Sequence, residues 1–273
     1  MLVTGGSMGI GLAVARELAA RGGRVAIGAR SIDAVEEALA TLAGSGHLGL
    51  GLDVADPAQW TSAIATLDAA GPLHGLVTAA GVQGPVGMLE ELAPDELKRA
   101  IDVNLIGTLL ALHHALPRLR ASGGRAVTLS GGGATAPLPR YDAYAASKAG
   151  VVRLTENVAR ASGVGVNAVA PGFVVTRMHD ATIEAGPERA GAEYYERSRR
   201  LLAEGGVPAS EAAELVCFLL SPEAEGITGR LISAQWDPWR EEEFRQQLRA
   251  DPDLATLRRI DEQFFIRRPE VRP

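Results

Sequence analysis

The chain contains a single cysteine, Cys217, among its 273 residues. One cysteine cannot form a disulfide within a chain, and Cys217 lies inside an apolar run, residues 215–220, so we expect a buried core thiol. No apolar run approaches the ~18 residues that a membrane-spanning helix needs, and no positively charged segment followed by an apolar one opens the chain. These absences predict no signal peptide, no membrane partner and a cytoplasmic location.

Dense basic stretches are also lacking. The chain carries 27 Lys and Arg against 33 Asp and Glu, which gives a net charge of −6, and the two signs are interspersed. This pattern does not favour a nucleic-acid partner. With 47% apolar residues the chain can bury a substantial core, and its length fits one large α/β domain or two small ones.

The chain opens with a short apolar run that ends in a glycine-rich turn, Thr4-Gly5-Gly6-Ser7-Met8-Gly9-Ile10-Gly11. An apolar helical pattern follows. Strand, glycine turn and helix form the context of a phosphate-binding loop, because glycines let the backbone approach a pyrophosphate and the helix N-terminus supplies free N–H groups. The stretch therefore predicts dinucleotide binding, with a plain tight turn as the alternative. Because the first strand is short, we also expect the natural start to lie upstream of Met1.

The second predicted strand, residues 24–29, ends without an acidic residue. In dinucleotide-binding folds an acidic side chain at this place holds the adenosine ribose, whereas an arginine accommodates a 2′-phosphate. Arg30 follows the strand here, and Ser31 is a plausible cap of the next helix. The position predicts a preference for NADP(H) over NAD(H).

Strand-like and helix-like segments alternate along the chain. Strands are expected at 1–4, 24–29, 47–52, 74–78, 125–129, 165–169 and 230–234, and helices after residue 10 and at 31–42, 57–70, 94–119, 142–161 and 209–220. This alternation predicts an α/β fold, a single doubly wound parallel sheet of about seven strands with helices on both faces. Ligands bind such sheets at the carboxyl ends of the strands. Residues that follow predicted strands directly are Arg30, Asp53, Ala80, Gly81, Ser130 and 171–176.

Tyr144 and Lys148 stand four residues apart on the predicted 142–161 helix. Positions i and i+4 share one face of a helix, so both side chains can reach one site. An unperturbed tyrosine titrates near pKa ~10, and a nearby cation is expected to lower that value toward neutrality. The spacing is common by chance, and by itself it leaves a tyrosine and a lysine on a solvated face as the alternative.

In this order and spacing, the glycine loop, Asn104, Ser130, Tyr144-x-x-x-Lys148 and Pro171-Gly172 resemble the classical short-chain dehydrogenase/reductase family over roughly residues 1–235. The resemblance implies a Rossmann-type fold and an oxidoreductase that interconverts a secondary alcohol and a ketone with NADP(H) or NAD(H). It implies no metal site.

The resemblance also assigns roles to single residues. Tyr144 is the general acid/base, and Lys148 binds the nicotinamide ribose and lowers the pKa of Tyr144. Ser130 orients the substrate oxygen, and Asn104 holds a water of the proton relay. The cofactor-binding residues that it implies are Gly5, Ser7, Met8, Gly9, Ile10, Gly11, Arg30, Ser31, Asp53, Val54, Ala80, Gly81, Tyr144, Lys148, Pro171, Gly172, Val174 and Thr176.

Three positions depart from the family pattern. Thr78 stands where the family usually has an asparagine. Ser130-Gly131 replaces a pair of serines of which the second is commonly the catalytic one. Met8 stands where many NADP-dependent relatives carry a basic residue.

The stretch 177–206 is polar and charged and is expected to form a mobile helical insertion over the strand ends. Its cations would meet an anionic substrate, which favours sugar or nucleotide-sugar redox chemistry as a second hypothesis; a solvated helix face is the alternative. These cations are Arg177, His179, Arg189, Arg197, Arg199 and Arg200. A third hypothesis is a redox-inactive dinucleotide-binding regulatory protein, against which the intact Asn104, Tyr144 and Lys148 argue.

Residues 236–273 differ in composition and are expected to form a C-terminal helical extension. Their large apolar side chains must bury against the chain itself or a neighbouring subunit, because soluble monomers rarely expose such a patch. We expect a homo-oligomer, a tetramer more than a dimer, whose tail walls the substrate pocket. The aromatic residues concerned are Trp236, Trp239, Phe244, Phe264 and Phe265, and the leucines expected in the core or at a subunit contact are Leu105, Leu109, Leu112 and Leu116.

Overall fold

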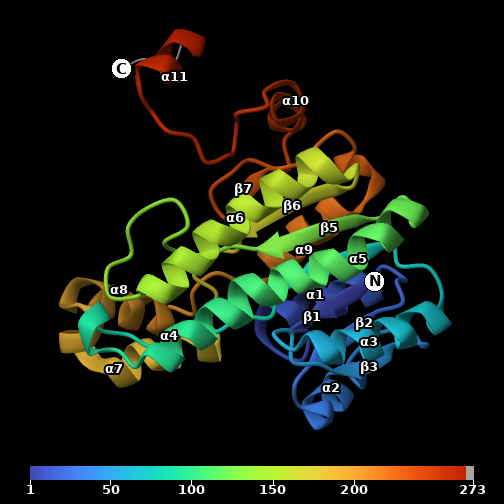
Figure 1. Ribbon diagram of the computed structural model, residues 1–273, viewed down its shortest axis with the longest axis horizontal. Helices are drawn as coiled ribbons and strands as arrows, with labels where there is room; N and C mark the ends of the chain where they lie inside the picture. The colour runs from blue at the N-terminus through green and yellow to red at the C-terminus, as the bar shows by residue number, and fades with distance from the viewer. Residues whose placement is uncertain (269–273) are drawn as a thin grey trace.

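Seven parallel strands form one sheet at the centre of the molecule (Figure 1), in the order β3-β2-β1-β4-β5-β6-β7. The computed structural model describes residues 1–268. The strands are β1 (Leu2–Thr4), β2 (Ala26–Ala29), β3 (Leu48–Gly51), β4 (Gly75–Thr78), β5 (Arg125–Leu129), β6 (Gly165–Ala170) and β7 (Leu231–Ser233). This sheet confirms the predicted α/β class. From β1 the chain runs outward to β3 and then returns to β4 on the other side of β1, and ligands bind at such a switch point.

Successive residues of each strand face opposite sides of the sheet and supply two cores. Val3 lies level with Ile27 on one side and Val77 on the other, and all three pack into the core beneath α1 (Gly9–Ala20) and α9 (Ala209–Leu220). Their neighbours Leu2 and Leu76 enter the opposite core. The in-register rows explain why the strands read as continuous apolar runs, as expected for parallel strands covered on both faces.

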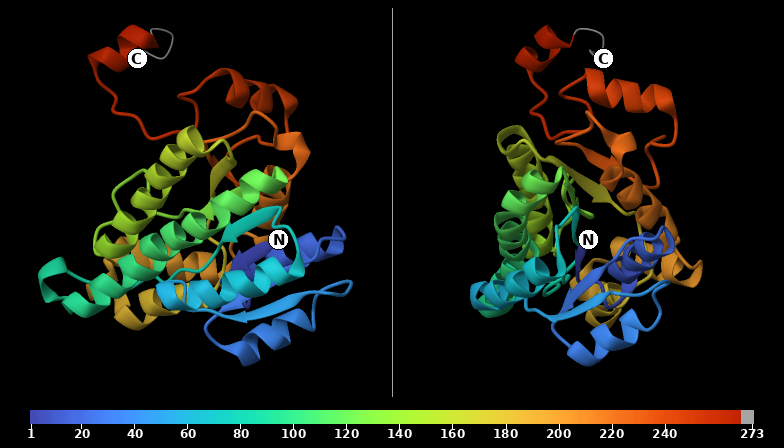
Figure 2. Two further views of the ribbon diagram at one scale, coloured as in Figure 1. Left: turned by 45° about the vertical axis from the view of Figure 1, so that its right-hand side comes forward. Right: turned by 90° about the vertical axis from the view of Figure 1, so that its right-hand side faces the viewer.

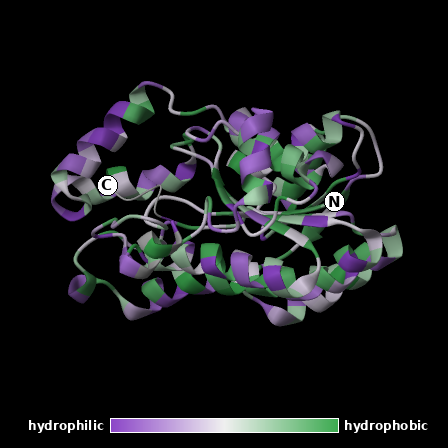
Figure 3. Cartoon of the chain, turned by 90° about the horizontal axis from the view of Figure 1, so that it is seen from above, coloured by the Kyte–Doolittle hydropathy of each residue, from purple (hydrophilic) through white to green (hydrophobic). Residues whose placement is uncertain are grey.

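Helices cover both faces of the sheet (Figure 2). On one face α1 packs against α9, with α2 (Ile32–Leu39) beside β2 and β3; on the other lie α3 (Pro57–Ala70), α5 (Gly107–Ser122) and α6 (Asp142–Ser162). These helices carry both hydrophilic and hydrophobic residues (Figure 3), as amphipathic surface helices do. Cys217 lies in the α9 core with 4% of its surface exposed, and burial raises its thiol pKa to about 12.

The predicted 94–119 helix is interrupted. It consists of α4 (Pro94–Ile101), a π-helical turn η2 (Asp102–Ile106) and α5. The expected leucine stripe does not share one environment along α5: Leu112 is 1% exposed, whereas Leu109 is 42% exposed. Short π segments inside α-helices frequently mark functional sites.

The 177–206 insertion forms η3 (Arg177–His179), α7 (Asp180–Ala190) and α8 (Ala192–Ala203). Residues of α7 and α8 pack with Val86 and with Tyr141, which is completely buried, in a small separate core. None of the described helices is long and apolar enough to span a membrane.

The C-terminal tail folds back on its own subunit through α10 (Glu242–Ala250), and α11 (Glu262–Arg267) lies beyond it, away from the sheet (Figures 1 and 2). Trp239 is 4% exposed and its ring lies 5.8 Å from that of Phe218 on α9. Trp236, by contrast, is 76% exposed, so the expected burial of the aromatics holds for Trp239 but not for Trp236 within one chain. Phe244 and Phe264 are partly buried, and the side chain of Phe265 lies outside the described residues.

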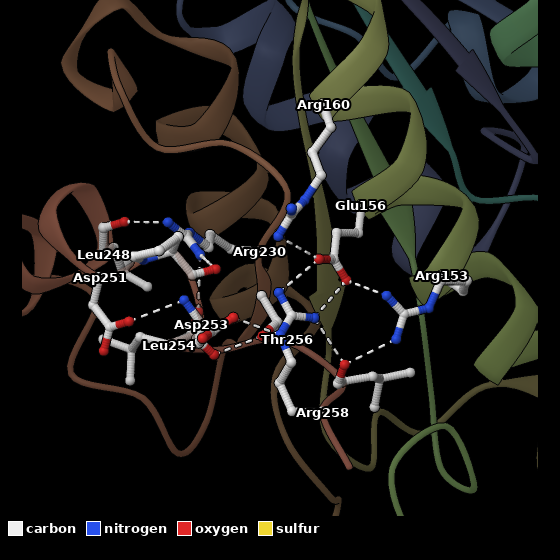
Figure 4. A network of polar contacts seen from close by, with 12 residues as sticks. Arg153, Glu156, Arg160, Arg230, Leu248, Asp251, Asp253, Leu254, Thr256 and Arg258 are labelled. Carbon is white, nitrogen blue, oxygen red and sulfur yellow. Dashed lines mark hydrogen bonds and ion pairs between the residues drawn. The ribbon is translucent and has the colours of Figure 1, made fainter. Parts of the chain in front are cut away.

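Charged contacts fix the tail to α6 and β7 (Figure 4). Arg258 donates to both carboxylate oxygens of Glu156, at 2.7 and 3.0 Å, while Arg230 donates to the backbone carbonyls of Leu248, Pro252 and Leu254. These contacts lie along the C-terminal half of α6 rather than over Tyr144. A tail that walls the substrate pocket therefore stays a prediction, and it concerns a neighbouring subunit.

Candidate active site

The glycine loop follows β1 at the switch point of the sheet and meets the loop that follows β4. Gly5 has φ +67°, and a Cβ there would come within 2.5 Å of the backbone nitrogen of Ala80. The two strand ends thus approach each other backbone to backbone. Met8, the N-cap of α1, offers no side-chain cap, and the first turn of α1 contains no acidic residue. The first N–H groups of the helix therefore remain open to a phosphate, and the loop fits the dinucleotide that the sequence predicts.

Arg30 and Asp53 follow β2 and β3 on the same edge of the sheet. Arg30 is exposed and forms no ion pair within residues 1–268. The Ser31 hydroxyl accepts from Ala34 N at 3.3 Å and caps α2, as expected. Asp53 Oδ1 accepts from the N–H of Ala55 at 3.0 Å. Both predicted adenosine-side residues therefore lie at the same edge of the sheet as the glycine loop.

Val54 is buried, and its carbonyl accepts the indole N–H of Trp60 at 2.9 Å. A Cβ at Gly107 would come within 2.6 Å of the Val54 side chain. The Val54 side chain therefore packs against Gly107, directly after the π turn.

Asn104 lies in the π turn with none of its surface exposed and joins three segments. Its Oδ1 accepts from the N–H of Val82 at 2.8 Å, and its Nδ2 donates to the Val82 carbonyl at 2.9 Å and to Ser147 Oγ at 3.0 Å. The amide therefore holds the loop after β4 against α6. Gly81 completes this corner, since a Cβ there would lie 3.2 Å from Asn104 Oδ1 and 3.6 Å from Lys148 Nζ.

Lys148 is 5% exposed, and its ammonium reaches the end of β5. Its Nζ donates to the carbonyl of Leu129 at 3.0 Å and lies 5.8 Å from the centre of the Tyr144 ring. Within residues 1–268 no acidic side chain forms an ion pair with it. Burial therefore lowers the pKa of Lys148 to about 8.

The expected lowering of the Tyr144 pKa is wrong for the protein as it stands here. Burial of the hydroxyl raises the pKa of Tyr144 well above its ordinary value, and Tyr194 adds to the shift. Desolvation disfavours the phenolate. Tyr144 is accordingly a neutral phenol in the free site.

Ser130 and Gly131 share the end of β5 but lie in different surroundings. Ser130 is 3% exposed, and its hydroxyl has no hydrogen-bond partner among the described residues. The Tyr144 hydroxyl lies against Gly131, in the space that a Cβ at position 131 would occupy. Ser130 therefore adjoins the residue that the Tyr144 hydroxyl contacts, but its own side chain is shielded from solvent. Its role in orienting a substrate stays a prediction. The Thr78 hydroxyl likewise finds no partner in the part of the chain that is described.

The stretch after β6 closes the site from the other side. Pro171 and Val174 are buried, and a Cβ at Gly9 would lie 3.2 Å from Thr176 Cγ2. Thr176 thus stands over the glycine loop. His179 holds the turn through a 3.0 Å contact between its Nε2 and the Val174 carbonyl.

A polar and aromatic cluster next to Tyr144 was not predicted from the sequence. Gln83 Nε2 donates to Thr182 Oγ1 at 2.8 Å, and the Tyr141 hydroxyl donates to the same atom at 3.2 Å. The Tyr141 and Tyr194 rings lie 4.9 Å apart. Tyr141 precedes α6 as its N-cap residue, three positions before Tyr144, and the sequence carried no signal of the partners that it meets.

A cavity of about 450 Å³ opens beside this cluster, between α4 and α7. Its lining includes Val82, Val86, Arg99, Ala181, Glu184 and Arg189. Arg189, one of the predicted insertion cations, therefore faces the cavity, together with acidic residues. Within residues 1–268 no group of three or more His, Cys, Asp or Glu is placed to hold a metal ion.

A glycine loop at the switch point, with the partly buried Tyr144 and the buried Lys148 beside it, defines a dinucleotide-dependent enzyme of the doubly wound α/β class. The family profile described as enoyl-(acyl carrier protein) reductase matches residues 5–235. A short-chain type dehydrogenase/reductase from Picea abies is 33% identical over 246 residues, which covers 85% of this chain and 89% of that protein. The 3-oxoacyl-(acyl-carrier-protein) reductase of Escherichia coli is 35% identical over 237 residues, with 85% and 93% covered.

Among solved structures, a variant of the actinorhodin polyketide ketoreductase with NADPH superposes with a TM-score of 0.76 at 29% identity, over 85% of this chain and 94% of that one. The chain belongs to the short-chain dehydrogenase/reductase family, a family of oxidoreductases.

Proposed function

We propose that this protein interconverts a secondary alcohol and a ketone with a nicotinamide dinucleotide and that it prefers NADP(H). One observation carries the proposal. The Tyr144 hydroxyl, the buried Lys148 and the hydrogen bonds between Asn104 and Val82 lie together at the carboxyl ends of β4 and β5, beside the glycine loop. The similar E. coli protein and the actinorhodin protein are both named as reductases of ketones, which supports the reaction class.

The residues of the chain divide the work of such a reaction. When bound, the nicotinamide supplies the hydride that is exchanged with the carbonyl carbon. Tyr144 donates its phenolic proton to the carbonyl oxygen as negative charge develops there. Lys148 holds the ribose and stabilises the phenolate that remains. Asn104 keeps the loop after β4 in place through its hydrogen bonds to Val82. In its predicted role it would also hold a water of the proton relay.

The protonation state of Tyr144 bears on the direction in which the reaction is tested. A neutral phenol is ready to give a proton to a ketone, whereas alcohol oxidation needs the phenolate that burial disfavours. We therefore propose ketone reduction as the direction to test first. The experiment is to follow NADPH consumption with a panel of β-keto esters and cyclic ketones. NADP⁺ reduction is followed with the matching alcohols, with aldoses and with nucleotide sugars.

The panel also separates the alternatives. Turnover confined to aldoses or nucleotide sugars would favour the sugar-redox hypothesis, for which Arg189 at the cavity is the supporting observation. Dinucleotide binding without turnover of any member would favour the redox-inactive regulatory protein.

We further propose a homo-oligomer, a tetramer more than a dimer, in the cytoplasm. Trp236, Ile260 and Ile266 on the tail are 76%, 71% and 61% exposed, and such side chains gain by burial against another subunit. The division into a 1–235 domain and a tail from 236 belongs to the same proposal. A molar mass in solution equal to that of one chain would contradict the oligomer.

A further inference from the structure

Arg177 lies beside the glycine loop although 169 residues separate it from Met8. Its guanidinium Nη2 is 2.7 Å from the Met8 sulfur. Arg177 opens η3, directly after Thr176, and its side chain is exposed. Within residues 1–268 it forms no ion pair, unlike the exposed Arg199 of α8, which pairs with Glu196 at 3.2 Å.

The surroundings of Arg177 carry positive potential without a compensating anion. Met8 is the N-cap of α1, whose first turn has no acidic residue, so the open N–H groups and the helix dipole present positive charge there. The guanidinium adds a full positive charge beside Met8, from the segment whose Thr176 lies against Gly9. A cation held against a flexible thioether gains little from it, whereas a phosphate between the two would satisfy both.

We infer that Arg177 binds the pyrophosphate of the cofactor from the side opposite the glycine loop. The inference rests on the proposed dinucleotide site. The group that Arg177 binds is the pyrophosphate rather than the 2′-phosphate, because Arg177 follows β6 and its side chain reaches the loop after β1. Arg30, at the end of β2, lies on the far side of β1 and serves the ribose.

Met8 carries no charge, so the glycine loop itself supplies no cation at this place. Arg177 of the 177–206 insertion supplies it instead. Arg177 also differs from the other insertion arginines, since among the described residues only Arg177 contacts the glycine loop through its side chain. Arg177 would therefore act on NAD(H) and NADP(H) alike, because both carry the pyrophosphate.

Calorimetric titration of the purified full chain with ADP-ribose, 2′-AMP, NAD⁺ and NADP⁺ tests this role without any turnover. Arg177→Gln should weaken ADP-ribose, NAD⁺ and NADP⁺ by about tenfold each, the loss expected for one charge-assisted contact, and should leave 2′-AMP unchanged. Arg30→Gln should weaken 2′-AMP and NADP⁺ but not ADP-ribose. Arg21→Gln, at the other end of α1 and 51% exposed in its side chain, is the matched control and should change none of them.

Unchanged ADP-ribose affinity in Arg177→Gln would overturn the inference while leaving the proposed function intact. A loss confined to 2′-AMP and NADP⁺ would move Arg177 to the 2′-phosphate and would equally contradict it. Failure of the unaltered protein to bind any of the four ligands would instead remove the proposed function, and this role with it. Arg177→Lys, which keeps the charge but not the guanidinium fork, should lose less affinity than Arg177→Gln.

Discussion

The Tyr144 hydroxyl occupies the space next to Gly131 that a side chain at position 131 would need. In the resembled family a serine commonly stands at this position. Here the absence of a Cβ lets the phenol approach the end of β5 and bury its hydroxyl, which raises its pKa. One glycine thus connects the local sequence of β5 to the protonation state of the proposed acid.

Gly131→Ala should displace Tyr144, because the new Cβ would overlap the phenolic oxygen. A misplacement of about 1 Å at a reacting group can cost about 10²-fold in rate, so we expect a fall of that order in kcat for ketone reduction. Gly132→Ala is the control, since a Cβ there would meet its nearest atom, in Leu138, at 3.7 Å. Equal loss in both variants would mean that the loop as a whole, and not the Tyr144 contact, matters.

The pH dependence of ketone reduction should follow Lys148. Its pKa is lowered to about 8 by burial, so its charge is present below pH 8 and is lost as pH rises through that value. Tyr144, whose pKa is raised, keeps its proton over the same range. We therefore expect kcat/KM, which reports the free enzyme, to decline above about pH 8. A flat profile between pH 6 and 10 would contradict this assignment.

Arg30→Ala should change cofactor choice rather than catalysis. Arg30 is exposed at the end of β2, and only NADP(H) carries a 2′-phosphate for its guanidinium to bind. We expect the dissociation constant of NADP(H) to rise about tenfold and that of NAD(H) to stay nearly constant. Tighter binding of NAD(H) than NADP(H) by the unaltered protein would show that the preference is wrong.

Arg258→Gln should loosen the tail. Glu156 is 5% exposed and receives both hydrogen bonds from Arg258, and loss of a charged hydrogen bond of this kind costs about 1.5–3 kcal/mol. We expect a lower free energy of unfolding and faster proteolysis near residue 251, where α10 ends. Arg160→Gln, whose side chain is 62% exposed, should cost less; equal melting of Arg258→Gln and the unaltered protein would contradict the account.

The same pair should make the tail sensitive to acid. The hydrogen bonds from Arg258, and the charges of Arg153 and Arg160, lower the pKa of Glu156. A lowered carboxylate pKa stabilises the fold above the ordinary value and loses that contribution as pH falls through the lowered one. Tail proteolysis in the unaltered protein should therefore increase in acid, below the ordinary range of a glutamate.

Periodicity and turn chemistry predicted most of the fold. The helices 57–70 and 209–220 and the strand 125–129 begin and end where expected, because caps, prolines and apolar spacing are local signals. The π turn at 102–106 has no such signal. It is stabilised by contacts from elsewhere, above all the hydrogen bonds between Asn104 and Val82, 22 residues away.

The site residues were likewise predictable where the signal was local and not where it depended on distant contacts. Strand ends brought the glycine loop, Asp53, Gly81 and Tyr144 to one edge of the sheet, as topology requires. The pKa of Tyr144 was mispredicted because spacing along a helix reveals a nearby cation but not the degree of burial. The partners of Gln83 and Arg177 could not be found either, since both side chains meet residues that are distant in sequence.

The most direct test of the account compares the unaltered protein with Tyr144→Phe in NADPH-dependent ketone reduction. The variant keeps the ring and removes only the proton donor. We predict a loss of roughly 10²–10⁴ in kcat, the range for general acid–base catalysis, with the dissociation constant of NADPH nearly unchanged. A Tyr144→Phe protein that binds NADPH and retains most of its turnover would contradict the assignment of Tyr144 as the catalytic acid.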